Sequence, residues 1–103
     1  MIKHARITYL LDFYRPLLTP HQQTLAALHY EEDLSITEIT EHTQSSRAAV
    51  HETLKRVEVV LESYEEALKL FEKHQQRKTL YAQLSAVNHP TVNDIVTKLD
   101  DLE

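Results

Sequence analysis

The chain contains no glycine among its 103 residues and only three prolines. Glycine is the residue that most easily supplies the positive φ angles of hairpins and tight turns. A fold that depends on many such turns is therefore unfavourable for this sequence. Residues that favour helices, such as Leu, Ala, Glu, Gln and Lys, are abundant instead. The sequence predicts an all-α fold.

The length corresponds to one domain, or to one small domain with an appendage. The absence of cysteine excludes disulfides and Cys-based metal sites and fits a reducing compartment. No apolar run is long enough to span a membrane, and polar residues interrupt the N-terminus where a signal peptide would have its apolar core. We therefore expect a cytoplasmic protein. The net charge of −5 counts against a non-specific binder of nucleic acid, but it permits one local basic strip.

Caps and apolar spacing divide the first part of the chain into short helices. The pattern predicts a helix over about residues 5–14, which Pro16 ends because proline disfavours the α conformation of the residue before it. The pair Thr19-Pro20 predicts the next helix, with a hydroxyl cap followed by proline at the first helical position. Ser35 and Glu38 have the spacing of a capping box, which starts a third helix.

Residues 35–56 have the layout of a helix-turn-helix. The third helix is followed by a turn at Thr43-Gln44-Ser45, and Ser45 or Ser46 caps the helix after it. The second helix of such a motif can enter the major groove of DNA. We therefore predict that the recognition helix is Ser46–Arg56.

The fourth helix is predicted to be long. Its apolar residues alternate spacings of four and three, as in a heptad pattern, and they are Val50, Leu54, Val57, Leu61, Tyr64, Leu68 and Phe71. No helix breaker follows before Asn88-His89-Pro90, so we expect the helix to continue past residue 73. This apolar stripe either packs only on the chain's own helices or helps to form a homodimer. The excess length slightly favours the homodimer.

The expected domains are a helix-turn-helix domain with a prolonged recognition helix, residues 1–73, and a C-terminal helical extension, residues 74–103. Thr91–Asp94 is a plausible cap for the last helix. Apolar residues at helical spacing follow it, so we expect one or two helices to fold back after Pro90. The extension is a candidate dimerisation element.

Seven residues around the turn are candidates for contacts with nucleic acid, namely Gln44, Ser45, Ser46, Arg47, His51, Lys55 and Arg56. Arg47, His51 and Lys55 share one helical face because they are spaced by four residues. The residues of the turn precede the N-terminus of a helix, where phosphates and base edges are contacted. The alternative is an ordinary solvated face, in which Glu52 and Glu58 neutralise the basic groups.

The sequence gives little support to an enzyme or a metalloprotein. Its seven histidines include no pair spaced by three or four residues, and no His-Glu-x-x-His motif occurs. Adjacent carboxylates such as Glu65-Glu66 point in different directions on a helix. We expect no cofactor and no metal, and enzymatic activity is the weakest of the functional hypotheses.

Several short segments within residues 7–70 form a specific combination, namely Leu10–Thr19, Gln22-Gln23, Tyr30, Glu32–Ser35, Glu38-Ile39, Ser46-Arg47, Ala49–His51, Leu54–Arg56 and Leu61-Glu62. These segments resemble the YlxM family, small helix-turn-helix proteins of Gram-positive bacteria. The helix-turn-helix of that family is similar to region 4 of bacterial sigma factors. Its genes lie beside those of the signal recognition particle GTPase and its receptor.

The resemblance implies a nucleic-acid-binding regulatory protein of the signal recognition particle pathway, with DNA or the particle RNA as its ligand. The alternative is an adaptor that binds the GTPase and has no DNA-binding activity. The family usually has glycine and then an aliphatic residue before Ser-Arg, where this chain has Gln44 and Ser45. Losing that glycine costs about 1 kcal/mol if the backbone there is left-handed. Losing the aliphatic side chain removes a small anchor worth ~1–3 kcal/mol.

Overall fold

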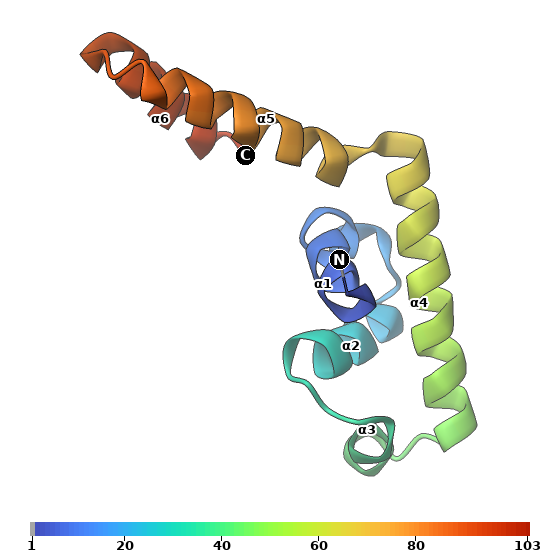
Figure 1. Ribbon diagram of the computed structural model, residues 1–103. Helices are drawn as coiled ribbons and strands as arrows, with labels where there is room; N and C mark the ends of the chain where they lie inside the picture. Colours follow the sequence, from blue (N-terminus) through green and yellow to red (C-terminus); the bar gives the residue numbers. More distant parts are fainter. Residues whose placement is uncertain (1) are drawn as a thin grey trace. The chain divides into compact units, whose positions relative to one another are not determined.

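The computed structural model describes residues 2–103, and no strand occurs among them (Figure 1). The elements are α1 (Lys3–Tyr14), the 3-10 turn η1 (Arg15–Leu17), α2 (Pro20–Ala26), the π-helical turn η2 (Ala27–Glu31), α3 (Ile36–Thr43), α4 (Arg47–Leu68), α5 (Leu70–Ala86) and α6 (Pro90–Asp101). The all-α prediction is confirmed. The chain divides into two compact units, Met1–Leu68 and Lys69–Glu103. No helix in the described part of the chain has both the length and the apolar character needed to cross a bilayer.

The capping box predicted at Ser35 is present, and the predicted cap at Thr19 is part of a second capping box that was not predicted from the sequence. The Thr19 hydroxyl accepts a hydrogen bond from the Gln22 backbone N–H at 3.2 Å, and the Gln22 side chain accepts one from the Thr19 N–H at 3.0 Å. Ser35 and Glu38 exchange the same two hydrogen bonds at the start of α3. Each box satisfies two backbone donors that a helix N-terminus would leave without a partner. The starts of α2 and α3 are therefore fixed locally.

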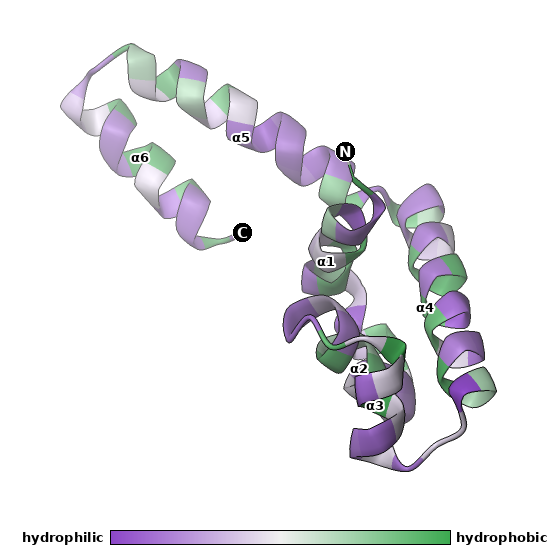
Figure 2. Cartoon of the chain, turned by 60° about the horizontal axis from the view of Figure 1, so that its bottom comes forward, coloured by the Kyte–Doolittle hydropathy of each residue, from purple (hydrophilic) through white to green (hydrophobic). Residues whose placement is uncertain are grey.

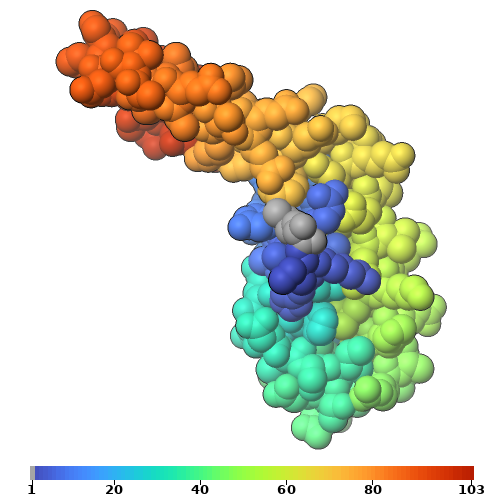
Figure 3. All heavy atoms as spheres, in the orientation of Figure 1, coloured from blue at the N-terminus to red at the C-terminus, as the bar shows by residue number. Residues whose placement is uncertain are grey.

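The core of the first unit lies where α1, α2 and α3 pack on one side of α4. Val50, Leu54, Val57 and Leu61 of α4 are buried, and they face apolar residues of the shorter helices. Figure 2 shows this division, with the apolar side of α4 turned toward α1–α3. In the space-filling view the atoms of α3 and of the start of α4 form one continuous surface (Figure 3). The helix-turn-helix is thus held by a packed core.

The predicted continuous helix past residue 73 is wrong, because α4 ends at Leu68. Lys69 adopts a left-handed conformation, with φ 56° and ψ 32°, and α5 begins directly after it. Such a conformation is unfavourable for a residue with a Cβ atom. Neither glycine nor proline marks this position, so the sequence contains no local signal for the break.

The predicted apolar stripe also departs from the structure near the end of α4. Tyr64 is only half-buried and Leu68 is exposed, whereas Glu65 is buried. The Tyr14 hydroxyl donates a hydrogen bond to the Glu65 carboxylate at 2.6 Å. A buried carboxylate is tolerated where a donor satisfies it, and the Tyr14 hydroxyl is that donor for Glu65. Burial therefore passes from the expected Tyr64 to Glu65.

The last helix begins earlier than the predicted cap at Thr91–Asp94. His89 is the residue before the helix, its side chain accepts a hydrogen bond from the Thr91 N–H at 3.2 Å, and Pro90 occupies the first helical position. Asn88 makes the preceding bend with a φ of 55°. Proline is suited to the first position because it has no N–H to satisfy there. The preference of proline for the first helical position explains why α6 begins at Pro90.

The second unit is a hairpin in which α5 and α6 run side by side (Figure 1). Within the hairpin, Glu103 receives hydrogen bonds from Arg77 at 2.5 and 2.9 Å and from the Tyr81 hydroxyl at 3.0 Å. Lys78 pairs with Asp100 at 2.5 Å. The prediction that one or two helices fold back after Pro90 is confirmed, because α6 packs against α5.

Candidate nucleic-acid interface

The turn between α3 and α4 is made by Gln44 in the left-handed conformation, with φ 57° and ψ 24°. The Gln44 N–H donates to the Thr40 carbonyl at 2.8 Å, which ends α3. The Ser46 hydroxyl then accepts a hydrogen bond from the Ala49 N–H at 3.1 Å and caps α4. The prediction of a sharp turn at residues 43–45 is confirmed. Of the two proposed caps, Ser46 is the one in place.

The apolar and the basic residues of α4 lie on different faces of the helix. Val50 and Val57 are fully buried, whereas Arg47, His51 and Lys55 are exposed. This is the separation that the helical spacing predicts. The structure thus brings Arg47, His51 and Lys55 together on one solvent-facing stripe at the start of the helix.

The remaining candidates have different surroundings. Gln44 and Ser46 are exposed, while Ser45 is half-buried in the turn. Arg56 is exposed beside Lys55, and both border a shallow depression together with Glu52 and Val59. Arg47 donates a hydrogen bond to the Thr37 hydroxyl at 2.6 Å. That bond leaves the other donors of the Arg47 guanidinium available.

The basic residues of the chain differ in whether a carboxylate neutralises them. Seven of the eleven Lys and Arg residues form an ion pair, namely Lys3, Arg6, Arg15, Lys69, Arg77, Lys78 and Lys98. Among residues 2–103, the four basic residues without an ion pair are Arg47, Lys55, Arg56 and Lys73. Three of these four lie in the first half of α4. The uncompensated positive charge is therefore concentrated where the sequence predicted a recognition helix.

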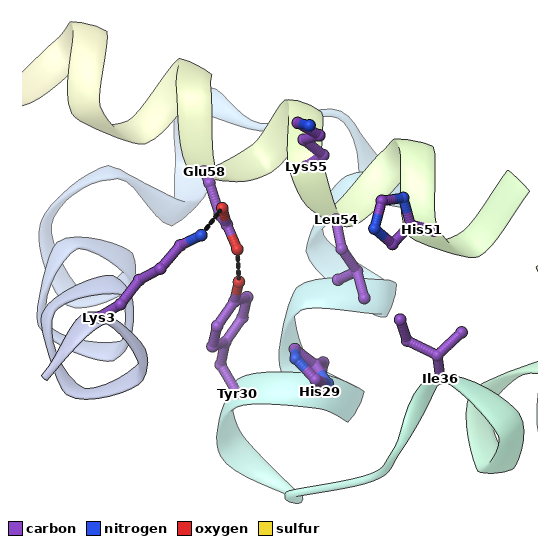
Figure 4. A pocket seen from close by; sticks show the side chains of 8 residues that line it. All are labelled: Lys3, His29, Tyr30, Ile36, His51, Leu54, Lys55 and Glu58. Carbon is purple, nitrogen blue, oxygen red and sulfur yellow. Dashed lines mark hydrogen bonds and ion pairs between the residues drawn. The ribbon is translucent and has the colours of Figure 1, made fainter. Parts of the chain in front are cut away.

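A cavity of about 250 Å³ opens beside this stripe (Figure 4). Four basic side chains surround it: His51 and Lys55 from α4, Lys3 from α1 and His29 from η2. Sequence reasoning missed Lys3 and His29, because they are far from the turn in sequence and only the folded chain brings them near it. We call this feature the α4 cavity.

The interior of the α4 cavity contains one carboxylate with two partners. Glu58 pairs with Lys3 at 2.8 Å and accepts a hydrogen bond from the buried Tyr30 hydroxyl at 2.6 Å (Figure 4). Burial opposes ionisation of Glu58, but the bonds from Lys3 and Tyr30 outweigh it and lower the pKa of the carboxyl. Burial, together with the bond to Glu58, raises the pKa of Tyr30 well above its ordinary range. Glu58 is thus held ionised and Tyr30 is held as a proton donor.

Two histidines that are distant in sequence meet behind this cavity. The rings of His4 and His29 lie 5.8 Å apart, and each also contacts the ring of Tyr30. The His29 Nδ1 atom lies 2.8 Å from the carbonyl oxygen of Leu34. A carbonyl can only accept, so Nδ1 carries a proton, and Nε2 is the ring nitrogen without that partner. Within residues 2–103, no group of three or more His, Asp or Glu residues is arranged to hold a metal ion.

The helix-turn-helix formed by α3, the turn and α4 agrees with a comparison between this chain and known protein families. Residues 1–102 match the model of the family described as "UPF0122: Putative helix-turn-helix protein, YlxM / p13 like". The chain belongs to this family. The resemblance to the YlxM family that the sequence segments suggested is confirmed.

Individual relatives match over nearly their full length. A UPF0122 protein of Exiguobacterium sibiricum is 43% identical over 102 residues, which cover 98% of this chain and 96% of the relative. A UPF0122 protein of Oceanobacillus iheyensis is 45% identical over 102 residues, covering 98% and 97%. A third from Bacillus licheniformis is 40% identical over 103 residues, covering 98% and 96%. The family similarity thus includes both the helix-turn-helix unit and the hairpin.

Proposed function

We propose that this chain binds nucleic acid through the start of α4, which acts as the recognition helix of its helix-turn-helix. The observation that carries the proposal is the concentration of unpaired basic residues there: Arg47, Lys55 and Arg56 are exposed and have no carboxylate partner among residues 2–103. Phosphate contacts supply most of the affinity of such interfaces. The proposed role of the chain is to bind rather than to catalyse. The proposed location is the cytoplasm.

The other predicted contact residues have roles consistent with this proposal. Gln44 and Ser46 are exposed at the N-terminus of α4, and Ser45 lies between them. Backbone N–H groups at a helix N-terminus favour phosphate. His51 lies between Arg47 and Lys55 along the stripe and adds an imidazole that can donate a hydrogen bond to phosphate.

The experiment is a mobility-shift titration with a short mixed-sequence DNA duplex and, in parallel, with the signal recognition particle RNA. Arg47→Ala combined with Lys55→Ala is expected to weaken binding by about tenfold or more, because two phosphate contacts are lost. The matched control is Lys73→Ala with Lys98→Ala, which makes the same change in net charge on the hairpin. Helicity is checked by circular dichroism. Unchanged affinity in the first variant would remove Arg47 and Lys55 from the interface.

A second candidate function is an adaptor that binds the signal recognition particle GTPase without binding DNA. The net charge of −5 and the exposed apolar residues of the hairpin favour it. A pull-down that offers DNA, the particle RNA and the purified GTPase side by side separates the two functions. Capture of the GTPase alone, insensitive to salt, would favour the adaptor. Steeply salt-dependent capture of either nucleic acid would favour the first proposal.

We also propose that the chain forms a homodimer through its α5–α6 hairpins. The hairpin buries Phe71 and Val96, whereas most of its large apolar side chains are exposed, namely Leu70, Leu80, Leu84, Val87, Ile95 and Leu102. Polypeptides of fewer than about 40 residues seldom have a sufficient core of their own. These side chains therefore need a covering surface.

The charges of the hairpin favour a second copy as that surface. Helix α5 has three basic residues and one Glu, whereas α6 has three Asp and one Lys. In a four-helix arrangement each α5 can lie between two α6 helices of opposite charge. Light scattering is expected to give a dimer mass that Leu84→Glu reduces to that of a monomer. A monomeric mass for the unaltered chain at high micromolar concentration would contradict this proposal.

A further inference from the structure

We propose that the α4 cavity binds a phosphate group through Lys55 and the imidazoles of His29 and His51, and that binding strengthens as the pH falls. The inference extends the proposed function, because a nucleic-acid backbone is one source of such a group. A free phosphorylated small molecule is the other source. The chemistry of recognition is the same for both.

The geometry supplies donors from separate elements around one opening. Lys55 and His51 lie on α4 above the cavity, and His29 reaches it from η2 (Figure 4). Leu54 and Ile36 provide apolar lining between them. Charge-assisted hydrogen bonds to phosphate are stronger when the surroundings are partly shielded from water. The cavity is also continuous with the basic stripe, since His51 and Lys55 belong to both.

The negative charge inside the cavity is already neutralised. Lys3 contacts one oxygen of the Glu58 carboxylate, and the Tyr30 hydroxyl donates to the other. Glu58 and Lys3 therefore cancel each other, and Lys55 is the remaining permanent cation that lines the cavity. An anion entering the cavity meets a net positive site.

The lining of the cavity contains two imidazoles, those of His29 and His51. The pKa of Glu58 is lowered and that of Tyr30 is raised, so Glu58 stays ionised and Tyr30 stays protonated near neutrality. Imidazole is the side-chain group that changes charge between about pH 5 and pH 8. Outside the lining, His4 pairs with Asp33 at 3.4 Å behind His29.

The His29 ring presents one defined nitrogen to a ligand. Its Nδ1 proton is directed to the Leu34 carbonyl, so Nε2 is the nitrogen that can meet a phosphate oxygen, and it donates only when the ring is an imidazolium. His51 is exposed on the stripe and has no such internal bond among the described residues. The imidazolium forms of both rings can therefore donate to phosphate without removing a structural bond.

The first arm of the experiment titrates inorganic phosphate into the full chain at constant ionic strength and follows the histidine ring signals by NMR. The His29 and His51 signals are expected to move together and to saturate, whereas the signal of His89, in the hairpin, stays unchanged. Lys55→Ala is expected to weaken saturation by at least about threefold, as the loss of one charge-assisted bond requires.

The second arm measures DNA affinity at about pH 6 and about pH 8, on either side of the ordinary histidine range. The unaltered chain is expected to bind at least about threefold more tightly in acid, and His29→Gln combined with His51→Gln should remove most of that gain. His42→Gln on α3, outside the cavity, is the matched control. Because His51 is exposed, His51→Gln alone keeps the test valid if the double variant does not fold.

The outcomes separate the cavity from the proposed function. Saturable phosphate shifts without DNA binding support the cavity, assign it to a small phosphorylated ligand and contradict the proposed function. If the Gln variants lose the gain in DNA affinity at low pH, the result supports phosphate binding in the cavity, with the nucleic-acid backbone as the ligand. In the remaining outcome, phosphate leaves the His29 and His51 signals unchanged while the Gln variants keep the full gain in DNA affinity at low pH. That result would overturn phosphate binding in the cavity and leave the proposed DNA binding intact.

Discussion

The two units of this chain distribute apolar and charged residues in opposite ways. The first unit buries most of its large apolar residues and leaves three basic residues of α4 without ion pairs. The hairpin pairs most of its basic residues, through Arg77, Lys78 and Lys98, and leaves most of its large apolar residues exposed. Burial in the first unit explains how it folds, and its unpaired charge is the basis of the proposed nucleic-acid interface. In the hairpin the exposed apolar residues are the basis of the proposed dimer contact instead.

The largest expected effect tests the difference in burial. Leu61→Ala removes a fully buried side chain of α4 and is expected to lower the free energy of unfolding by ~2–5 kcal/mol, through lost transfer energy and the cavity left behind. Leu80→Ala, at a half-exposed position of α5, should cost less than ~1 kcal/mol in dilute, monomeric protein. Urea unfolding measures both. Equal losses would mean that the hairpin has a core comparable to that of the first unit.

The next effect compares two tyrosine hydroxyls that donate to carboxylates. Tyr30→Phe leaves the partly buried Glu58 without one of its donors and should cost ~1–3 kcal/mol. Tyr81→Phe removes a similar bond to Glu103 and should cost less than ~0.5 kcal/mol, because Arg77 and His74 remain as partners of that carboxylate. Thermal unfolding of the two variants measures both losses of stability. A larger loss for Tyr81→Phe would reverse the comparison.

A smaller and opposite effect is expected at the left-handed residues that join the helices. Gln44→Gly should stabilise the first unit by ~0.5–1 kcal/mol, because the left-handed penalty of ~1–2 kcal/mol exceeds the entropy cost of glycine. Gln83→Gly, in the interior of α5, should instead destabilise by ~1 kcal/mol. Denaturant midpoints measured by circular dichroism compare the two. A loss of stability in Gln44→Gly would show that the Gln44 side chain contributes more than its backbone costs.

The smallest effect concerns pH. The folded state lowers the pKa of Glu58, so the unfolded chain binds protons more readily as the pH falls. The contribution of Glu58 is therefore complete above its unfolded pKa of about 4.5 and is lost as the pH falls through the folded value. Glu58→Gln should lower stability at neutral pH and flatten the acid side of the stability curve, measured as urea midpoint against pH. Parallel curves for the two proteins would contradict the assignment.

Local signals in the sequence predicted the first unit well. The cap at Thr19, the capping box at Ser35 and the turn at Gln44 depend on neighbouring residues, and each was confirmed. The exposure of Arg47, His51 and Lys55 followed from helical spacing alone. Such features need no knowledge of distant contacts.

Features that depend on tertiary structure were missed. The break at Lys69 has no glycine or proline to mark it, and the burial of Glu65 depends on Tyr14, a residue in another helix. The α4 cavity likewise requires Lys3 and His29 to approach α4, which no spacing in the sequence indicates. Propensity and periodicity describe one helix at a time, whereas these features arise between helices.

The most direct test of the central claim, that the unpaired basic residues of α4 form the nucleic-acid interface, is the salt dependence of DNA affinity. The slope of log affinity against log salt is measured by fluorescence anisotropy for the unaltered chain, for Arg47→Ala with Lys55→Ala and Arg56→Ala, and for Lys73→Ala with Lys98→Ala. The α4 variant should reduce the slope by about 2–3, close to one for each phosphate contact, and the hairpin variant should leave it unchanged. Equal slopes for all three proteins, or binding that does not depend on salt, would contradict the account.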